Sequence, residues 1–511
     1  MKKFSKILSA MLAILLLLSA AMAITSCNKK PAEGEGSGTT PDVIDTSDTK
    51  PEIPELEVID LDGAEIKILW PEIHGDGHYA HNEITGAESG GDAIDMAVVT
   101  RNAMVEKKYN VKITSETAFI SDIAGKYRDE AMNGGTPAFS ALVSSINNGK
   151  MTSCAIEGWL ADFNKLEYYD EAHPWWNHDL MEGFSISGAR YFATGDIIYS
   201  DDFYPYCTYV NTAVSDITLG ANYDFYSLVK GKEWTLEKFN QLAAQAQSVP
   251  ENTTDEPKDW ANGAIAGAIV NENFAKAAYY AAGKGMITYN SAGTPIWQMT
   301  PTYVSSVLPQ IHEFIHKDKA CFNVGGLADT IGGNHAIIQT ESFTANKCLF
   351  LVEELIFSER IVTSGTSVDF KILPFPLYEE GGEYRCVLND AAVIAIPDLL
   401  DDEEKDNVAL VLSAMSRASM DTLTPAFFDK VLSSRYMGDA QSKEILQTIL
   451  GSTVAPDIAT IYNWGGFREE FKRLAFETDY AGFDAYYESN KGQINKEITD
   501  YIESLDKYYG R

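Results

Sequence analysis

Residues 64–70 read Ala64-Glu65-Ile66-Lys67-Ile68-Leu69-Trp70, in which polar and apolar side chains alternate before an apolar end. Such alternation is typical of a β-strand with one buried face. A helical pattern follows over 92–109, then a second strand over 111–114, a second helix over 121–132 and a third strand over 139–143. This order of strands and helices predicts parallel strands covered by helices, and we therefore expect an α/β fold.

The remainder of the chain is predicted to be mixed in its middle section and mainly helical towards its end. Thr235 is a suitable N-cap for a helix that runs to about residue 247. No repeat with a period of about 20–50 residues is present. The further predicted strands are 264–270, 347–352, 370–373 and 391–396, and the further predicted helices are 301–317, 403–417, 426–432, 441–450, 465–476 and 492–508.

The N-terminus has the pattern of an export signal. Three lysines within the first six residues precede an uncharged run from Ile7 to Ile24, which ends in Thr25-Ser26-Cys27. A basic start, an apolar centre and small residues at the end are typical of a secretory signal. The cysteine makes the segment resemble a bacterial lipoprotein signal, which implies cleavage before Cys27 and acylation of that residue. The alternative is a transmembrane anchor, because the apolar run is close to the minimum spanning length.

Residues 27–57 join this signal to the ordered part of the chain. They are rich in Pro, Gly, Ser, Thr, Glu and Asp and have almost no aliphatic pattern. Such a composition favours a disordered tether. We therefore predict a signal over 1–26, and a lipidated cysteine with its tether over 27–57. The expected location is the outer side of the cell membrane, with a lipid as the anchor.

The composition excludes several classes of partner. Lys and Arg number 40 against 74 Asp and Glu, so the formal net charge is −34. A chain this acidic repels phosphate backbones and anionic headgroups, and we expect no nucleic-acid partner. Cys27 leaves five cysteines at wide, unpatterned spacings, which is no disulfide framework. The length favours two large lobes over a single core.

Seven segments, in order along the chain, resemble the family 1 extracellular solute-binding proteins of ABC importers, which are maltose-binding-protein-like. One of them, Met132-Asn133-Gly134-Gly135-Thr136-Pro137, is similar to the family's A-x-G-x-x-P-D turn, although Ala138 replaces the usual Asp. Each segment alone is a weak signal, and their order behind a lipoprotein signal strengthens the resemblance. The other six are the strand ending at Trp70, and residues 105–113, 158–166, 191–196, 233–239 and 370–376.

This resemblance implies a two-lobed, type II periplasmic-binding-protein-like α/β fold with an interlobe ligand cleft and crossed hinge connections. It places the first part of the N-lobe at 58–193 and the first part of the C-lobe at 194–387. A return segment of the N-lobe at 388–424 and C-terminal helices of the C-lobe at 425–511 follow. It also implies a monomeric, non-enzymatic receptor without a cofactor, which delivers a carbohydrate, expected to be an oligosaccharide, to an ABC permease by hinge closure.

The candidate ligand-binding residues combine flat aromatic faces with carboxylates, because a sugar offers apolar ring faces and a rim of hydroxyls. Trp70 ends the first strand, where ligands of open α/β sheets lie. Glu353 and Glu354 follow an apolar strand, and burying a carboxylate there requires a ligand or an arginine. The resemblance implies an aromatic face for sugar near Trp464. The complete predicted set is Trp70, His74, Asp202, Tyr204, Tyr206, Glu353, Glu354 and Trp464, with no catalytic residue and no metal ligand.

Two histidine patterns leave other functions open. His312-Glu313-Phe314-Ile315-His316 fits the H-E-x-x-H motif of zinc proteases, but both histidines lean towards the polar side of their helix and no third ligand is evident. His74, His78 and His81 cluster after the first strand and are a candidate zinc site. The alternative functions are therefore the same receptor fold with a peptide, a polyamine or a metal ion as ligand, and a secreted zinc protease or glycoside hydrolase.

Overall fold

The structure is a computed structural model in which thirteen segments are described. The predicted signal, Cys27, almost all of the tether and His74, His78 and His81 lie outside these segments. Residues 54–511 form one compact unit. The described segments are residues 53–72, 82–87, 91–146, 149–185, 188–248, 256–260, 263–291, 294–317, 320–331, 333–388, 390–433, 440–476 and 482–509.

The first sheet is built from the strands predicted at the start of the chain. It contains β1 (Ala64–Pro71), β2 (Val111–Ala118), β3 (Ala141–Ser145) and β12 (Ala392–Ala395), in the order β12-β3-β1-β2. β1 runs parallel to β2 and β3, with Ile68 opposite both Ser115 and Ala141, whereas β12 is antiparallel to β3. The predicted parallel arrangement is therefore present, and one late strand returns to its edge.

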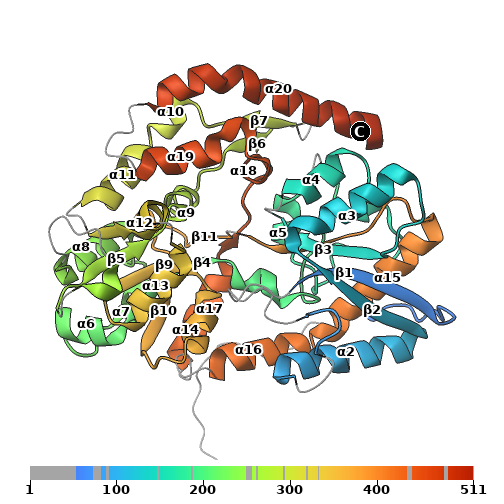
Figure 1. Cartoon of the computed structure of the whole chain (residues 1–511), viewed down its shortest axis with the longest axis horizontal. Coiled ribbons are helices and arrows are strands. Elements are labelled where there is room, and N and C mark those ends of the chain that lie inside the picture. Colours follow the sequence, from blue (N-terminus) through green and yellow to red (C-terminus); the bar gives the residue numbers. More distant parts are fainter. Residues whose placement is uncertain are drawn as a thin grey trace, which may run out of the picture. The chain divides into compact units, whose positions relative to one another are not determined.

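Two helices connect these strands and begin and end at suitable residues. α2 (Ala93–Tyr109) starts with a capping box between Asp92 and Asp95 and ends at Asn110 in the left-handed conformation. α3 (Ile120–Asn133) ends at Gly134, where φ is +64°. Figure 1 shows both helices beside β1, β2 and β3, and α15 (Asp402–Ser419) packs on α2.

The second sheet has five strands in the order β10-β4-β9-β5-β8. β5 is parallel to β8 and β9, and β4 is antiparallel to β9 and β10. The ring of Phe350 on β9 packs on Trp234 and Phe239 at centroid distances of 5.5 and 5.0 Å, which fixes helix α8 against this sheet. The strands are β4 (Tyr206–Asn211), β5 (Ala266–Val270), β8 (Cys321–Asn323), β9 (Cys348–Glu354) and β10 (Phe370–Pro374).

The chain alternates between the two sheets. It builds β1 to β3 of the first sheet, then all five strands of the second, and then returns with β12 to the first. Helices α15 and α16 (Leu423–Ser433) pack on α2, after which α17 (Ala440–Gly451) packs on β10. The lobe boundaries at 193, 387 and 424 stay predictions.

The other helices and strands complete the fold around the two sheets. Within the described residues, no helix combines the length and apolarity that a bilayer crossing needs. These elements are α4 (Gly149–Ile156), η1 (Phe163–Lys165), α5 (His178–Gly183), η2 (Tyr199–Phe203), α6 (Thr212–Thr218), α7 (Phe225–Lys230), α8 (Leu236–Ala246), η3 (Pro257–Asp259), α9 (Asn273–Ala281), β6 (Ile287–Tyr289), β7 (Pro295–Trp297), α10 (Pro301–Val304), α11 (Leu308–His316), α12 (Val324–Ile331), α13 (His335–Thr344), α14 (Phe357–Thr363), β11 (Cys386–Val387), β13 (Thr453–Val454), α18 (Ile458–Tyr462), η5 (Trp464–Gly466), α19 (Phe467–Phe476) and α20 (Phe483–Tyr509).

One predicted helix is wrong as a single element. The pattern over 301–317 gives two helices, α10 and α11, which are separated at residues 305–307. Pro309 is in the first turn of α11, where the absent N–H costs nothing, whereas in a continuous helix its ring would clash with the carbonyl of Ser305. In contrast, the helix predicted over 492–508 is part of the longer helix α20.

Arg101 ties α2 to two other segments. Its side chain is fully buried, and Nη2 donates to the carbonyl oxygens of Glu83 (2.7 Å) and Ile84 (3.0 Å). Nη1 donates to the carbonyl oxygen of Ile197 at 3.0 Å, on the segment that leads towards β4. Burial lowers the pKa of Arg101 to about 9, and the charge of Glu83 opposes this. The guanidinium group thus donates hydrogen bonds to three carbonyl oxygens that take part in no strand pairing or helix.

Arg101→Met should therefore destabilise the fold severely. Methionine replaces most of the volume but leaves the carbonyls of Glu83 and Ile197 without their donor, while that of Ile84 keeps only the hydrogen bond from Asn102. We expect a loss of about 3–5 kcal/mol in the free energy of unfolding. Urea denaturation measures this loss. The matched control is Lys107→Met on the exposed side of the same helix, which should change the free energy by less than about 1 kcal/mol. Equal effects of the two variants would contradict the role given to Arg101.

Candidate functional site

The candidate site lies at the edge of the second sheet where its parallel strands end. β9 ends at Glu353 and Glu354, and β4 begins opposite them, with Tyr206 paired to Glu354. β5 is parallel to β9, so Asn271, which follows β5, lies at the same edge. Ligands of open α/β sheets bind beyond these carboxyl ends.

Three buried polar side chains form what we call the Glu353 cluster, namely Asn271, Gln339 and Glu353. Oε2 of Glu353 accepts a hydrogen bond from Nδ2 of Asn271 at 2.9 Å and from Nε2 of Gln339 at 2.6 Å. Burial raises the pKa of Glu353, and the charge of Arg360 and the Gln339 hydrogen bond oppose this rise. The carboxyl group is thus oriented by two amides, which is an arrangement suited to recognising hydroxyl groups.

A buried lysine lies close to this edge. Lys276 is on α9, one turn after Asn271, and is 5 % exposed. Burial lowers its pKa to about 7, with a further lowering by Lys472, whereas the charges of Glu354 and Asp390 raise it. Asp390 precedes β12 of the first sheet and accepts a hydrogen bond from Ser145 at 2.5 Å. Lys276 therefore interacts electrostatically with carboxylates next to both sheets.

Elsewhere in the fold lies a pocket, which we call the Asp202 pocket, with a volume of about 190 Å³. Four aromatic rings and two carboxyl groups line it, together with Gly195 and Thr424, which lie close to two of the predicted lobe boundaries. The Tyr199 and Phe427 rings stack with centroids 5.1 Å apart. The lining residues are Pro174, Trp175, Trp176, Asn177, Gly195, Asp196, Ile198, Tyr199, Asp202, Thr424 and Phe427.

The two carboxyl groups of this pocket are held in an environment that disfavours their charge. Burial raises the pKa of Asp202 to about 7, and the neighbouring Asp196 raises it further. Burial also raises the pKa of Asp196 to about 6, although the hydroxyl of Thr424 donates a hydrogen bond to it and opposes the rise. The hydroxyl therefore compensates for burial only at Asp196.

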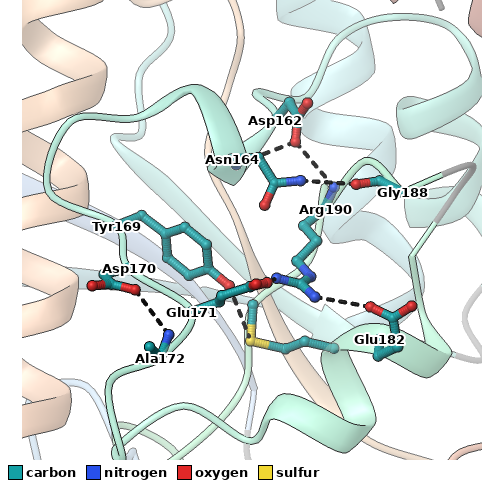
Figure 2. Close-up of polar contacts among 10 residues, drawn as sticks. Asp162, Asn164, Tyr169, Asp170, Glu171, Ala172, Glu182, Gly188 and Arg190 are labelled. Carbon is teal, nitrogen blue, oxygen red and sulfur yellow. Dashed lines mark hydrogen bonds and ion pairs between the residues drawn. The ribbon is translucent and has the colours of Figure 1, made fainter.

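A buried arginine anchors the loop that carries the two tryptophans of the pocket. Figure 2 shows Arg190 between Glu171 and Glu182, to which it forms ion pairs, the second at 2.8 Å. The backbone N–H of Arg190 donates to Oδ1 of Asp162 at 3.0 Å. Glu171 and Glu182 flank Trp175 and Trp176 in the sequence, so this ion-pair cluster restrains both ends of the loop.

The backbone fixes the inner part of the same loop. The N–H of Asn177 donates to the carbonyl of Thr194 at 3.0 Å, and the N–H of Asp196 donates to the carbonyl of Trp175 at 3.0 Å. At Gly195, where φ is +149°, an added Cβ would lie 2.2 Å from the Trp175 carbonyl oxygen. Only glycine permits this approach of the two backbones.

The predicted site residues do not form one group in the described structure. Tyr206, Glu353 and Glu354 lie together at the edge of the second sheet, whereas Asp202 lines the other pocket. Tyr204, two positions after Asp202 in the sequence, is fully buried, and Trp70 is fully buried at the end of β1. The ligand-binding roles of all these residues stay predictions, and His74 lies outside the described residues.

Trp464 is held inside an aromatic cluster. It is 4 % exposed, and its ring lies 6.2 Å from that of Tyr462 and 5.4 Å from that of Tyr501 on α20. An aromatic face for a sugar would have to come from this packed position, so its role also stays a prediction.

Sequence reasoning did not select five residues of these two regions. They are Asn271, Gln339 and Lys276 at the edge of the second sheet, and Asp196 and Trp176 in the Asp202 pocket. The amides lie 68 positions apart in the sequence. The pairing of β5 with β9 places Asn271, and the packing of α13 on β9 places Gln339. The sequence offered one indication for Lys276, because it is the only charged residue in the apolar segment Phe274–Ala282.

The zinc-protease motif is part of the packing of two helices. His312 and His316 lie on α11 with ring centroids 4.1 Å apart, and Nε2 of His316 is 3.1 Å from the carbonyl oxygen of Ala475. Among the residues that the structure describes, no group of three or more His, Cys, Asp or Glu could hold a metal ion.

Asp202→Asn should change the pH dependence of stability. Because the folded-state pKa of Asp202 is raised to about 7, the folded chain keeps a proton that the unfolded chain loses from about pH 4 upwards, and stability falls as pH rises through this window. We expect the variant to be more stable than the parent by about 1–2 kcal/mol at about pH 8 and equally stable at about pH 4.

Urea denaturation at several pH values measures this difference. Asp402→Asn, at a side chain that is 99 % exposed, is the matched control and should leave the pH profile unchanged. A constant difference between Asp202→Asn and the parent chain at every pH would contradict the raised pKa.

Comparison with solved structures shows which proteins share this fold. No protein-family model and no curated protein matches the sequence. Among solved structures, the cyclic alpha-maltosyl-1,6-maltose binding protein of Arthrobacter globiformis is similar, with 13 % identity and a TM-score of 0.54 over 85 % of this chain and 99 % of that one. The UgpB protein of Mycobacterium tuberculosis, in complex with glycerophosphocholine, has 13 % identity and a TM-score of 0.53 over 79 % of this chain and 96 % of that one.

A third structure is the maltose/maltodextrin-binding domain MalE of Bdellovibrio bacteriovorus bound to maltotriose. It has 12 % identity and a TM-score of 0.50 over 85 % of this chain and 100 % of that one. The predicted type II binding-protein fold is thereby confirmed, since the match spans nearly the whole length of these proteins. The chain has the fold of the maltose-binding-protein-like substrate-binding proteins of ABC importers.

Proposed function

We propose that the protein is a lipid-anchored extracellular receptor that captures a carbohydrate, most simply an oligosaccharide, and presents it to an ABC permease. The observation that carries this proposal is the Glu353 cluster at the carboxyl ends of β5 and β9, in a fold shared with receptors for maltotriose and cyclic alpha-maltosyl-1,6-maltose. These neighbours are binding proteins, which supports a receptor over an enzyme.

The chemistry of the Glu353 cluster agrees with this proposal. Sugar hydroxyls both donate and accept hydrogen bonds, and a carboxylate flanked by amides offers partners for both roles. Tyr206 begins β4 opposite Glu354 and adds an aromatic ring beside the two glutamates. Lys276 provides a further donor close to Glu354. Together these residues combine the polar and flat surfaces that sugar recognition requires.

Hinge closure is the proposed route by which binding is communicated to the permease. The chain passes repeatedly between the two sheets, and Asp390, beside β12 of the first sheet, interacts electrostatically with Lys276 of the second. A ligand that contacts both sets of residues would favour the state in which they are close, and the permease would recognise that state. The lipid on Cys27 and the tether to residue 57 would hold this receptor near its permease.

Glu353→Gln should weaken the binding of the oligosaccharide. The substitution keeps the shape but removes the charge that strengthens a hydrogen bond from a hydroxyl group. We expect the dissociation constant to rise by about tenfold to a hundredfold. Calorimetric titration of the full chain with the best sugar from a panel of malto-oligosaccharides, cyclic glucans and other glycans measures this change.

The matched control is Glu383→Gln, at a side chain that is 80 % exposed, which should leave the affinity unchanged. Glycerophosphocholine belongs in the panel because a neighbour with the same fold binds it. Binding of that compound with no binding of any glycan would refute the carbohydrate assignment and leave the receptor fold intact. Conversion of a bound glycan to products would refute the receptor role.

A further inference from the structure

The Asp202 pocket contains two carboxylic acids, and none of its lining residues is a lysine, arginine or histidine. Asp196 raises the cost of ionising Asp202, and burial penalises the charge of both. Further negative charge acts on the wall of the pocket, because the charges of Glu83 and Glu359 help to raise the pKa of Tyr199. The ring of His173 stacks on that of Trp175, with their centroids 4.2 Å apart. The hydroxyl of Thr424 offsets this cost in part at Asp196, and a positive group in the pocket would relieve what remains.

The walls of the pocket suit an organic cation better than a metal ion. Trp175, Trp176, Tyr199 and Phe427 line it, and aromatic faces attract ammonium groups through their negative π-surfaces. Two carboxyl groups supply fewer oxygens than a hard divalent cation takes, and no metal-binding group is found among the described residues. The volume of about 190 Å³ is below that of typical drug-sized sites, so the occupant would be small.

The same walls also offer hydrogen-bond donors. Trp175 is fully buried and Trp176 is 5 % exposed, yet the Nε1–H group of neither has an acceptor in the part of the chain that the structure describes. A buried donor without an acceptor is uncommon in native proteins and calls for a partner. An oxygen atom on the occupant of the pocket would be such a partner. The pocket thus combines acceptors for a positive nitrogen with donors for an oxygen.

We propose that the Asp202 pocket binds a hydroxylated organic ammonium group, with the carboxyl groups of Asp196 and Asp202 facing the nitrogen. The chemistry fits two sources, which are a free amino alcohol and the amino group of a sugar. The pocket shares no lining residue with the Glu353 cluster. The proposal therefore extends the proposed function and does not depend on its sugar site.

Calorimetric titration of the full chain with matched probes tests the charge. Choline carries a permanent positive charge, and 3,3-dimethyl-1-butanol has the same shape without it. At about pH 8 we expect choline to bind about tenfold to a hundredfold more tightly than its neutral analogue. Asp202→Asn should weaken the binding of choline by a similar factor and leave that of the neutral analogue unchanged. Asp402→Asn, at an exposed side chain at the start of α15, should leave the binding of both unchanged.

The pH profile separates binding by these carboxyl groups from a structural effect of the substitution. Choline cannot lose its charge, so its affinity should rise from about pH 5 to about pH 8 as Asp196 and Asp202 ionise. This rise should be reduced in Asp202→Asn and in Asp196→Asn. The thermal midpoint of each variant shows that it is folded, and the second variant provides the test if the first is not.

Glucosamine and glucose distinguish the two sources of the ammonium group. Tighter binding of glucosamine than of glucose shows that the ammonium group is carried by a sugar. Binding of choline without binding of glucosamine shows that a separate amino alcohol is the ligand. Equal affinity for choline and its neutral analogue, no loss in either aspartate variant, or no binding of either amine overturns the proposal. Titration of the same samples with oligosaccharide, compared with Glu353→Gln, reports on the carbohydrate assignment independently of these outcomes.

Discussion

The pairing between residues 193–194 and β12 is the interaction on which the rest of the structure depends. Ala193 and Ile394 exchange two backbone hydrogen bonds of 2.9 and 2.8 Å, and the hydroxyl of Thr194 donates to the carbonyl of Ala392 at 2.9 Å. Farther along, Pro205 forms an isolated bridge with Leu388. Two segments almost two hundred positions apart are therefore held antiparallel to each other where the chain leaves the first sheet and where it returns.

This pairing has consequences for the Asp202 pocket and for the surroundings of Lys276. The segment that leaves the first sheet continues through Asp196 and Asp202 to β4, and the segment that returns begins at Asp390. The Asp202 pocket is thus built on one partner of the pairing, and the charge near Lys276 on the other. Backbone hydrogen bonds between buried strands have few alternative partners, so the register of this pairing is strongly specified. Side chains on both segments are consequently fixed relative to the same backbone frame.

Much of the fold could be predicted from the sequence because its local signals agree with the tertiary structure. Alternation at 64–70 and helical spacing at 92–109 correspond to β1 and α2, the cap at Asp92 marks the start of α2, and Gly134 marks the end of α3. The prediction of one helix over 301–317 was wrong because the apolar periodicity continues through Pro309. A proline inside a continuous helix lacks the N–H donor and clashes with the preceding turn, so the helix is divided there.

The site could be predicted only in part, for a physical reason. Glu353 and Glu354 could be selected from the sequence because a pair of acids directly after an apolar strand is informative by itself. Gln339 and Asn271 could not be predicted, because an amide on a helix and an amide in a loop carry no local signal. Only strand pairing and the packing of α13 on β9 bring them to the same carboxylate. Asp202 was selected, yet its partners Asp196 and Thr424 were not, because their contact depends on where two distant segments meet.

The contrast between Glu353 and Asp202 shows why two carboxyl groups in one protein can serve different ligands. Both have pKa values raised by burial. At Glu353, two amide donors and the charge of Arg360 compensate for the lost hydration, so the carboxyl group is already paired and can orient a neutral hydroxyl at modest cost. At Asp202 the nearest charge is another acid, and the compensation has to come from the ligand. A site that lacks its counter-charge selects for ligands that bring one, because a neutral ligand would leave the desolvation cost in place.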